Sequence, residues 1–101
     1  MREISFTQAV MEALCEEFRR DEKTVYMSTH IPRALAEFGK SRIRATPISE
    51  SAFVGAAIGL AGSGFRPVVN IRNAAFAFVA ADQFANQAAK ITYMFGGQAK
   101  F

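Results

Sequence analysis

Apolar side chains recur every three or four positions between residues 6 and 20, while acids and arginines fill the positions between them. This spacing gathers the apolar side chains on one face of a helix. Ser5 and Gln8 stand three residues apart at its start, in the form of a capping box. The pattern therefore predicts a helix over 6–20.

Three later runs are short and rich in β-branched or aromatic residues, which predicts strands at 23–27, 42–45 and 65–71. The apolar centre of the third run is continuous, which is typical of a parallel strand covered on both faces. Pro67 lies near the start of that run, where a missing N–H is tolerated.

Helical segments separate the predicted strands. Proline suits a first turn and glycine suits a stop, so a short helix is predicted from Pro32 to Phe38, ending before Gly39. Ser49 is placed to cap a second helix over 50–61.

A long final helix is predicted from Phe76 or Phe78 to Phe95, closed by Gly96 and Gly97. Helices that alternate with short apolar strands predict an α/β fold, a three-layer sandwich with a mostly parallel sheet. Because three short strands make a thin sheet, we expect residues 1–101 to be a single truncated domain.

The composition indicates a globular chain and limits the classes of partner that it can have. Half of the 101 residues are apolar, and the formal charge is +3 with a pI near 9.4. The basic residues are scattered instead of clustered between aromatic residues, so nucleic-acid binding is not expected. The longest uncharged run, 51–65, is too short to span a membrane. Cys15 is the only cysteine, which together with the lack of a signal-peptide pattern predicts a reducing, cytoplasmic location.

Charge is unevenly divided, since residues 1–50 carry 16 of the 21 charged side chains. The second half is therefore expected to be buried, either in its own core or against a partner. We expect a homo-oligomer formed through the helices near 50–61 and 77–95.

Glu50 stands out in the charge pattern, because Asp82 is the only acidic residue that follows it in the chain. One interpretation is structural: an anion in a first helical turn is stabilised by about 0.3–1 kcal/mol. The other is functional, because Glu50 follows a predicted strand at the edge where open α/β sheets bind ligands. The pattern alone leaves both open.

Two long stretches carry a family resemblance, "TPISESAFVGAAIGLAGSGFRPVV" (46–69) and "DQFANQAAKITYMFGGQ" (82–98). With the opening "MREISFTQAVMEAL", they resemble the β subunits (E1 component) of thiamine-diphosphate-dependent 2-oxo acid dehydrogenases of the pyruvate, branched-chain and acetoin type. The resemblance implies an incomplete transketolase-like pyrimidine-binding domain.

The resemblance also implies roles for three residues. Glu50 matches the glutamate that hydrogen-bonds N1′ of the cofactor aminopyrimidine and promotes its proton relay, Phe76 matches the aromatic residue that packs on that ring, and Arg72 would lie near the ring edge. The implied cofactor is thiamine diphosphate, with Mg²⁺ only if a partner such as an E1 α-like subunit supplies the diphosphate site.

The sequence also departs from the family pattern. Asn70 stands where an acid is usual, Arg72 and Asn73 stand where apolar or aromatic residues are usual, and "STHIPRA" (28–34) replaces a longer loop. A chain of this length supplies at most half of the site, so we expect it to be inactive on its own. The alternative is an orphaned oligomerisation or interaction module that has lost cofactor binding.

Three further features of the sequence each allow two interpretations. His30 is either an ordinary loop histidine or a ligand contact. Gly55 and Gly59 share a helical face that packs either on the chain's own sheet or on another subunit. The stripe formed by Asp82, Asn86 and Lys90 is either solvated or part of an interface. No set of metal-ligating residues has suitable spacing, so no metal site is expected.

Overall fold

A three-stranded parallel sheet organises the chain in a computed structural model that describes residues 2–99. The strands are β1 (Thr24–Ser28), β2 (Ile43–Ala45) and β3 (Arg66–Val69), in the order β2-β1-β3. Tyr26 of the central strand is paired with Ile43 on one side and Val68 on the other. The predicted α/β fold with a mostly parallel sheet is confirmed, and every pairing in this sheet is parallel.

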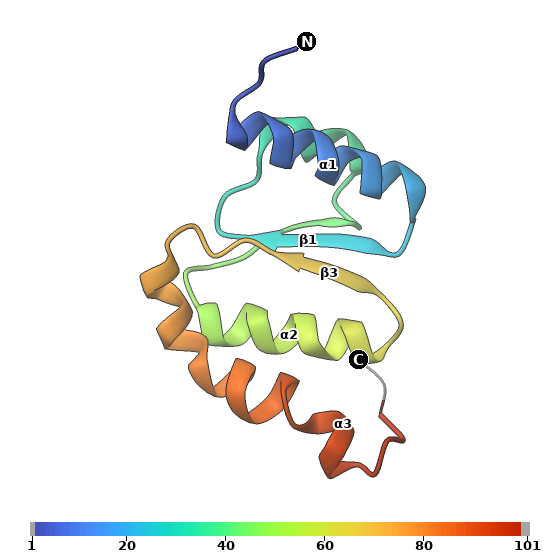
Figure 1. Cartoon of the computed structure of the whole chain (residues 1–101), viewed down its shortest axis with the longest axis vertical. Helices are drawn as coiled ribbons and strands as arrows, with labels where there is room; N and C mark the ends of the chain where they lie inside the picture. The colour runs from blue at the N-terminus through green and yellow to red at the C-terminus, as the bar shows by residue number, and fades with distance from the viewer. Residues whose placement is uncertain (1, 100–101) are drawn as a thin grey trace.

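Helices cover both faces of the sheet (Figure 1). Helix α1 (Phe6–Arg20) lies on one face, and helix α2 (Glu50–Gly62) lies on the other. A short 3₁₀ helix, η1 (Arg33–Phe38), connects β1 to β2 and packs beside α1. The three-layer arrangement predicted from the sequence is therefore present.

Helix α1 begins where the capping pattern places it. The Ser5 hydroxyl accepts a hydrogen bond from the backbone N–H of Gln8 at 3.2 Å. The side chain of Gln8 donates to Glu12 instead of returning to Ser5, so only half of the capping box forms. One satisfied amide is enough to start the helix at the predicted residue.

Two apolar clusters flank β1 because its side chains alternate between the faces of the sheet. Val25 and Met27 point toward α2, where they join a cluster with Phe53. Tyr26 points the other way, into a cluster with Phe18 of α1. The central strand is thus buried along its whole length, which fixes the sheet between its two helical layers.

The prediction of one long final helix was wrong. The segment consists of a 3₁₀ helix, η2 (Ala74–Ala80), a π-helical segment, η3 (Gln83–Ala88), and a short α-helix, α3 (Ile91–Met94). It lies on the outer side of α2 (Figure 1).

Contacts with α2 account for the changes in winding. The hydroxyl of Ser51 donates to the carbonyl of Val79 at 2.6 Å, which engages that carbonyl at the end of η2. The side chain of Gln83 packs on Gly55 at the start of η3. A side chain that engages a helical carbonyl, as Ser51 does, can interrupt regular winding, and the contact of Gln83 holds the next segment against α2.

Ser49 also behaves differently from its prediction. It occupies the N-cap position of α2, yet its side chain makes no capping hydrogen bond. Its backbone carbonyl instead accepts from the N–H groups of Ala52 and Phe53, each at 3.1 Å. Glu50 is the acidic residue in the first turn of α2.

The sparsely charged second half is not fully buried within the chain itself. Large apolar side chains on its final segment are exposed: Phe76, Phe78, Val79, Phe84, Tyr93, Met94 and Phe95. The interpretation that this half forms its own core is wrong for these residues. No helix of the described residues is long and apolar enough to cross a membrane.

The two glycines of α2 have different surroundings. A methyl group added to Gly55 would lie 2.8 Å from Oε1 of Gln83, whereas one added to Gly59 would have no atom within 4 Å. Gly55 therefore faces the chain's own final segment instead of its sheet. Gly59 is open, so a subunit contact there stays a prediction.

Gly59→Ala is expected to stabilise the chain by about 1 kcal/mol, since alanine has the higher helix propensity and meets no obstruction. Gly55→Ala is the matched control, because it gains the same propensity but must displace Gln83. Urea unfolding followed by circular dichroism measures both. Equal stabilisation by the two variants would contradict the close approach of Gln83.

Candidate functional site

A cavity of about 460 Å³ opens at the carboxyl ends of β1 and β3. Thr29 follows β1, Asn70 follows β3, and Glu50 begins α2, so three separate elements bring polar side chains to it. This is the edge at which open α/β sheets bind ligands, and the volume lies within the usual range for small-molecule sites.

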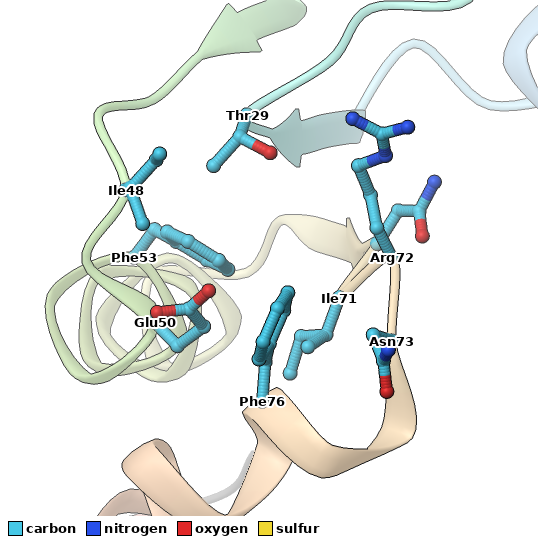
Figure 2. Close-up of a pocket in the computed structure, with 9 residues that line it drawn as sticks. Thr29, Ile48, Glu50, Phe53, Ile71, Arg72, Asn73 and Phe76 are labelled. Atoms are coloured by element: carbon cyan, nitrogen blue, oxygen red, sulfur yellow. The ribbon is translucent and has the colours of Figure 1, made fainter.

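Glu50 is the acid of this cavity. Its residue is only 8% exposed, and Figure 2 shows its carboxylate turned into the cavity. No hydrogen bond or ion pair joins that carboxylate to another of residues 2–99. The carboxylate oxygens face the cavity instead of a protein donor among these residues. The side chain is therefore available to a ligand that offers a donor.

Aromatic and aliphatic side chains form the walls around this acid. Phe53 comes from α2, Ile71 follows β3, and Phe76 comes from η2. The ring of Phe76 lines the same cavity as Glu50, and Figure 2 shows both rising into it. Phe53 is buried and Phe76 is half exposed, at 49%. This combination suits a flat, weakly polar ring that needs one hydrogen bond to a carboxylate.

Asn70 is held in place by two buried side chains of β1. Its Nδ2 donates to the hydroxyl of Tyr26 at 2.8 Å, and its backbone carbonyl accepts from the hydroxyl of Ser28 at 3.0 Å. Its backbone N–H also donates to the carbonyl of Met27 at 3.0 Å, which extends the sheet ladder past the end of β3. The residue thus enters the cavity with a fixed backbone and a fixed amide.

Arg72 is the cation of the cavity lining. It is exposed, and its guanidinium makes no hydrogen bond or ion pair with the other described residues. Figure 2 shows it on the side of the cavity away from Glu50 and Phe76.

One cavity brings together all three residues singled out from the sequence, namely Glu50, Phe76 and Arg72. Sequence reasoning missed the anchoring of Asn70 by Tyr26 and Ser28, which joins residues more than 40 positions apart. The one sequence signal for this anchoring was Asn70 itself, a single amide side chain within the apolar run that ends at Ile71. Phe53 lies on the same predicted helix as Glu50, but it was not singled out from the sequence.

The other candidate residues lie away from this cavity. His30 is exposed and does not line it, although its backbone N–H donates to Ser28. Asn86 donates to Asp82 and accepts from Lys90, each at 2.8 Å, so the predicted stripe is linked through its central amide and lies exposed. Within residues 2–99, no three His, Cys, Asp or Glu side chains are grouped to hold a metal ion.

Comparison with known proteins decides the family. The family described as "Transketolase, pyrimidine binding domain" matches residues 2–100. The chain belongs to this family. Its match extends over all the elements that build the cavity, so the predicted resemblance is confirmed.

This pyrimidine-binding domain is similar to β subunits of larger enzymes. It is 38% identical to "Pyruvate dehydrogenase E1 component subunit beta" of Rickettsia felis over 97% of the chain and 33% of that protein. The corresponding protein of Rhizobium meliloti is 36% identical over 97% of the chain and 24% of its own length. "Acetoin:2,6-dichlorophenolindophenol oxidoreductase subunit beta" of Cupriavidus necator is 36% identical over 98% of the chain and 35% of its length. The chain thus spans about a third or less of these relatives.

Proposed function

We propose that the chain forms the pyrimidine-binding half of a thiamine diphosphate site, as part of a 2-oxo acid dehydrogenase β subunit that serves oxidative decarboxylation. The observation that carries the proposal is the carboxylate of the largely buried residue Glu50, which has no partner among the described residues and shares an apolar cavity with Phe76. The similarity to pyruvate dehydrogenase and acetoin oxidoreductase β subunits supports the reaction class.

The residues of the cavity fit the aminopyrimidine ring. Phe76 supplies a face for stacking, and Phe53 and Ile71 keep water from the ring. Glu50 would share a proton with the ring nitrogen N1′, so that its carboxylate accepts a charged hydrogen bond from the protonated ring. When bound, thiamine diphosphate supplies a carbon acid and, through its own aminopyrimidine, the base for it.

The diphosphate and its metal require a second chain in this proposal. The described residues group no metal ligands, and the glycines at 62 and 64 are not followed by the lysine of a phosphate loop. We propose that an E1 α-like subunit supplies that half, and that the chain is inactive without it. The buried free thiol of Cys15 supports a reducing, cytoplasmic location.

Calorimetric titration with thiamine diphosphate and Mg²⁺ tests this function. The proposal expects measurable heat and a raised melting temperature, because a ligand that binds only the folded state stabilises it. Saturating cofactor that produces neither heat nor a thermal shift, with or without an E1 α-like chain, would refute cofactor binding.

The alternative is an oligomerisation or interaction module, and the exposed apolar side chains of η2 and α3 favour it. Phe78 and Tyr93 are 82% and 89% exposed, and burying such side chains against a second copy would contribute about 1.5–3 kcal/mol each. Phe78 and Tyr93 do not line the cavity, although Phe76 of η2 does, so association through these two residues could be kept whether or not the cofactor binds.

Sedimentation analysis is expected to find a homo-oligomer that uses the segment near 77–95. Replacing Phe78 and Tyr93 together with aspartate is expected to yield monomers, since both charges would have to be buried at the interface. Phe6→Asp, at an equally exposed phenylalanine of α1, is the control and leaves the oligomer intact. A monomeric parent chain would contradict the homo-oligomer, and an oligomer without cofactor binding would leave the module as its function.

A further inference from the structure

The cavity has two chemically different sides. Glu50 lies among aromatic and aliphatic side chains, and it is the only carboxylate that lines the cavity. On the other side, Arg72 is the only cation of the lining, and Asn70, two residues before it in the chain, also lines the cavity. Figure 2 shows the guanidinium of Arg72 away from the carboxylate. The two charges do not neutralise each other, because no ion pair joins them.

Within residues 2–99, no hydrogen bond ties the guanidinium of Arg72 into the fold. Arg72 makes no hydrogen bond or ion pair with the other described residues, in contrast to Arg42, whose side chain donates to three backbone carbonyls. Its five N–H donors are therefore available to solvent or to a ligand in the cavity. Guanidinium groups pair strongly with carboxylate and phosphate because two parallel hydrogen bonds can form.

Asn70 adds a neutral polar group beside this cation. The Tyr26 hydroxyl and the Ser28 hydroxyl fix its side chain and its backbone, so it needs no reorganisation when a ligand enters. A neutral amide at this place leaves the positive charge of Arg72 uncompensated. Because one N–H of Nδ2 donates to Tyr26 and the backbone N–H donates to Met27, Asn70 keeps one N–H donor that could assist the guanidinium of Arg72 in holding an oxyanion.

We propose that Arg72, supported by Asn70, forms an oxyanion subsite opposite Glu50 that binds the anionic group of the ligand. The inference rests on the proposed function for the identity of that ligand. Two sources share this chemistry, namely the carboxylate of a 2-oxo acid and a phosphate of thiamine diphosphate, and the second would mean that this chain shares the diphosphate half assigned above to a second chain. Binding at one end by a carboxylate and at the other by a guanidinium orients the ligand across the cavity.

Nuclear magnetic resonance titrations of the whole chain test the subsite with two anions, inorganic pyrophosphate and pyruvate. At least one of them is expected to shift the Nε–Hε signal of Arg72 and the amide signals of Asn70. Arg72→Met is expected to weaken that binding about tenfold, the loss of a charged hydrogen bond. Arg72→Lys keeps the charge without the planar fork and is expected to give an intermediate affinity.

Arg33→Met is the matched control, because Arg33 is exposed, has no partner among the described residues and lies outside the cavity. It removes the same charge and is expected to leave binding unchanged. If only pyrophosphate binding depends on Arg72, the subsite holds the cofactor phosphates. If only pyruvate binding depends on Arg72, the subsite holds the substrate carboxylate. If neither anion binds, or if both Met variants bind the anions equally, the subsite is refuted.

Thiamine, which carries no phosphate, separates this inference from the proposed function. If thiamine fails to bind while an anion binds through Arg72, the oxyanion subsite stands and the pyrimidine site falls. If thiamine binds and neither anion depends on Arg72, the pyrimidine site stands and the subsite falls.

Discussion

Phe18→Ala is expected to lower the free energy of unfolding by about 4 kcal/mol, the largest effect on stability that we predict. The Phe18 side chain is 1% exposed, and its ring centroid lies 5.0 Å from that of Phe38. The Cζ atom of Arg42 lies 4.6 Å from the same ring centroid. The substitution would leave a void and remove the surface on which the guanidinium stacks.

The loss would extend beyond the ring because Arg42 connects three parts of the chain. Its guanidinium donates to the carbonyls of Phe18 and Asp21, and its Nε donates to the carbonyl of Thr24. These bonds tie the end of α1 to the start of β1. Small domains have about 5–15 kcal/mol of total stability, so the variant would be close to unfolding.

Urea unfolding of Phe18→Ala measures this loss, and Phe6→Ala is the matched control on the same helix. Phe6 is 85% exposed, so its replacement is expected to change stability by less than about 0.5 kcal/mol. A loss below about 1 kcal/mol for Phe18→Ala would contradict the packing of α1 on the sheet.

Local patterns predicted the parts of the fold that local interactions determine. Helix α1 has the predicted bounds, 6–20, because its cap and its apolar face both lie within its own sequence. The strands are found within one to two residues of their predicted ends. Gly39 has a φ of 78°, which suits its predicted role after the short helix.

The final segment could not be predicted in the same way because contacts with α2 determine it. Residues 76–95 have helical spacing, yet Ser51 engages the carbonyl of Val79 and Gln83 packs against Gly55. Both contacts join residues about 28 positions apart. A periodic pattern carries no information about such contacts, so it predicted a continuous helix.

The candidate site also combines residues that the sequence identified and contacts that it could not show. The quoted stretches placed Glu50, Phe76 and Arg72, and the cavity contains all three. The amide of Asn70 was visible in the sequence, but its bond to Tyr26 depends on the register between β1 and β3. The sequence therefore indicated the ligand-facing residues better than the residues that hold them.

Glu50→Gln is expected to weaken binding of the aminopyrimidine ring by about 10- to 150-fold, the range that corresponds to a charged hydrogen bond of about 1.5–3 kcal/mol. The amide has the same shape but no negative charge. The fold is expected to survive, because the lost interaction with the N-terminal end of α2 is worth only about 0.3–1 kcal/mol. Loss of ligand binding without loss of stability is the result typical of a functional acid.

Glu22→Gln is the control for charge, because Glu22 is exposed in the turn between α1 and β1. It is expected to bind the ring as well as the parent chain does. If Glu50→Gln unfolded the chain, the carboxylate would be a structural group of the first turn of α2, as the other interpretation of this residue holds.

The most direct test of the pyrimidine site is a thiamine titration of the isotopically labelled chain, followed by nuclear magnetic resonance. Thiamine carries the aminopyrimidine without the diphosphate, so it needs only the half of the site that this chain supplies. We expect the largest shifts at the amides of Glu50, Ile71 and Phe76, with binding kept in Glu22→Gln and lost in Glu50→Gln. Shifts located elsewhere, or equal binding by Glu50→Gln and the parent chain, would contradict the proposal that Glu50 holds the pyrimidine.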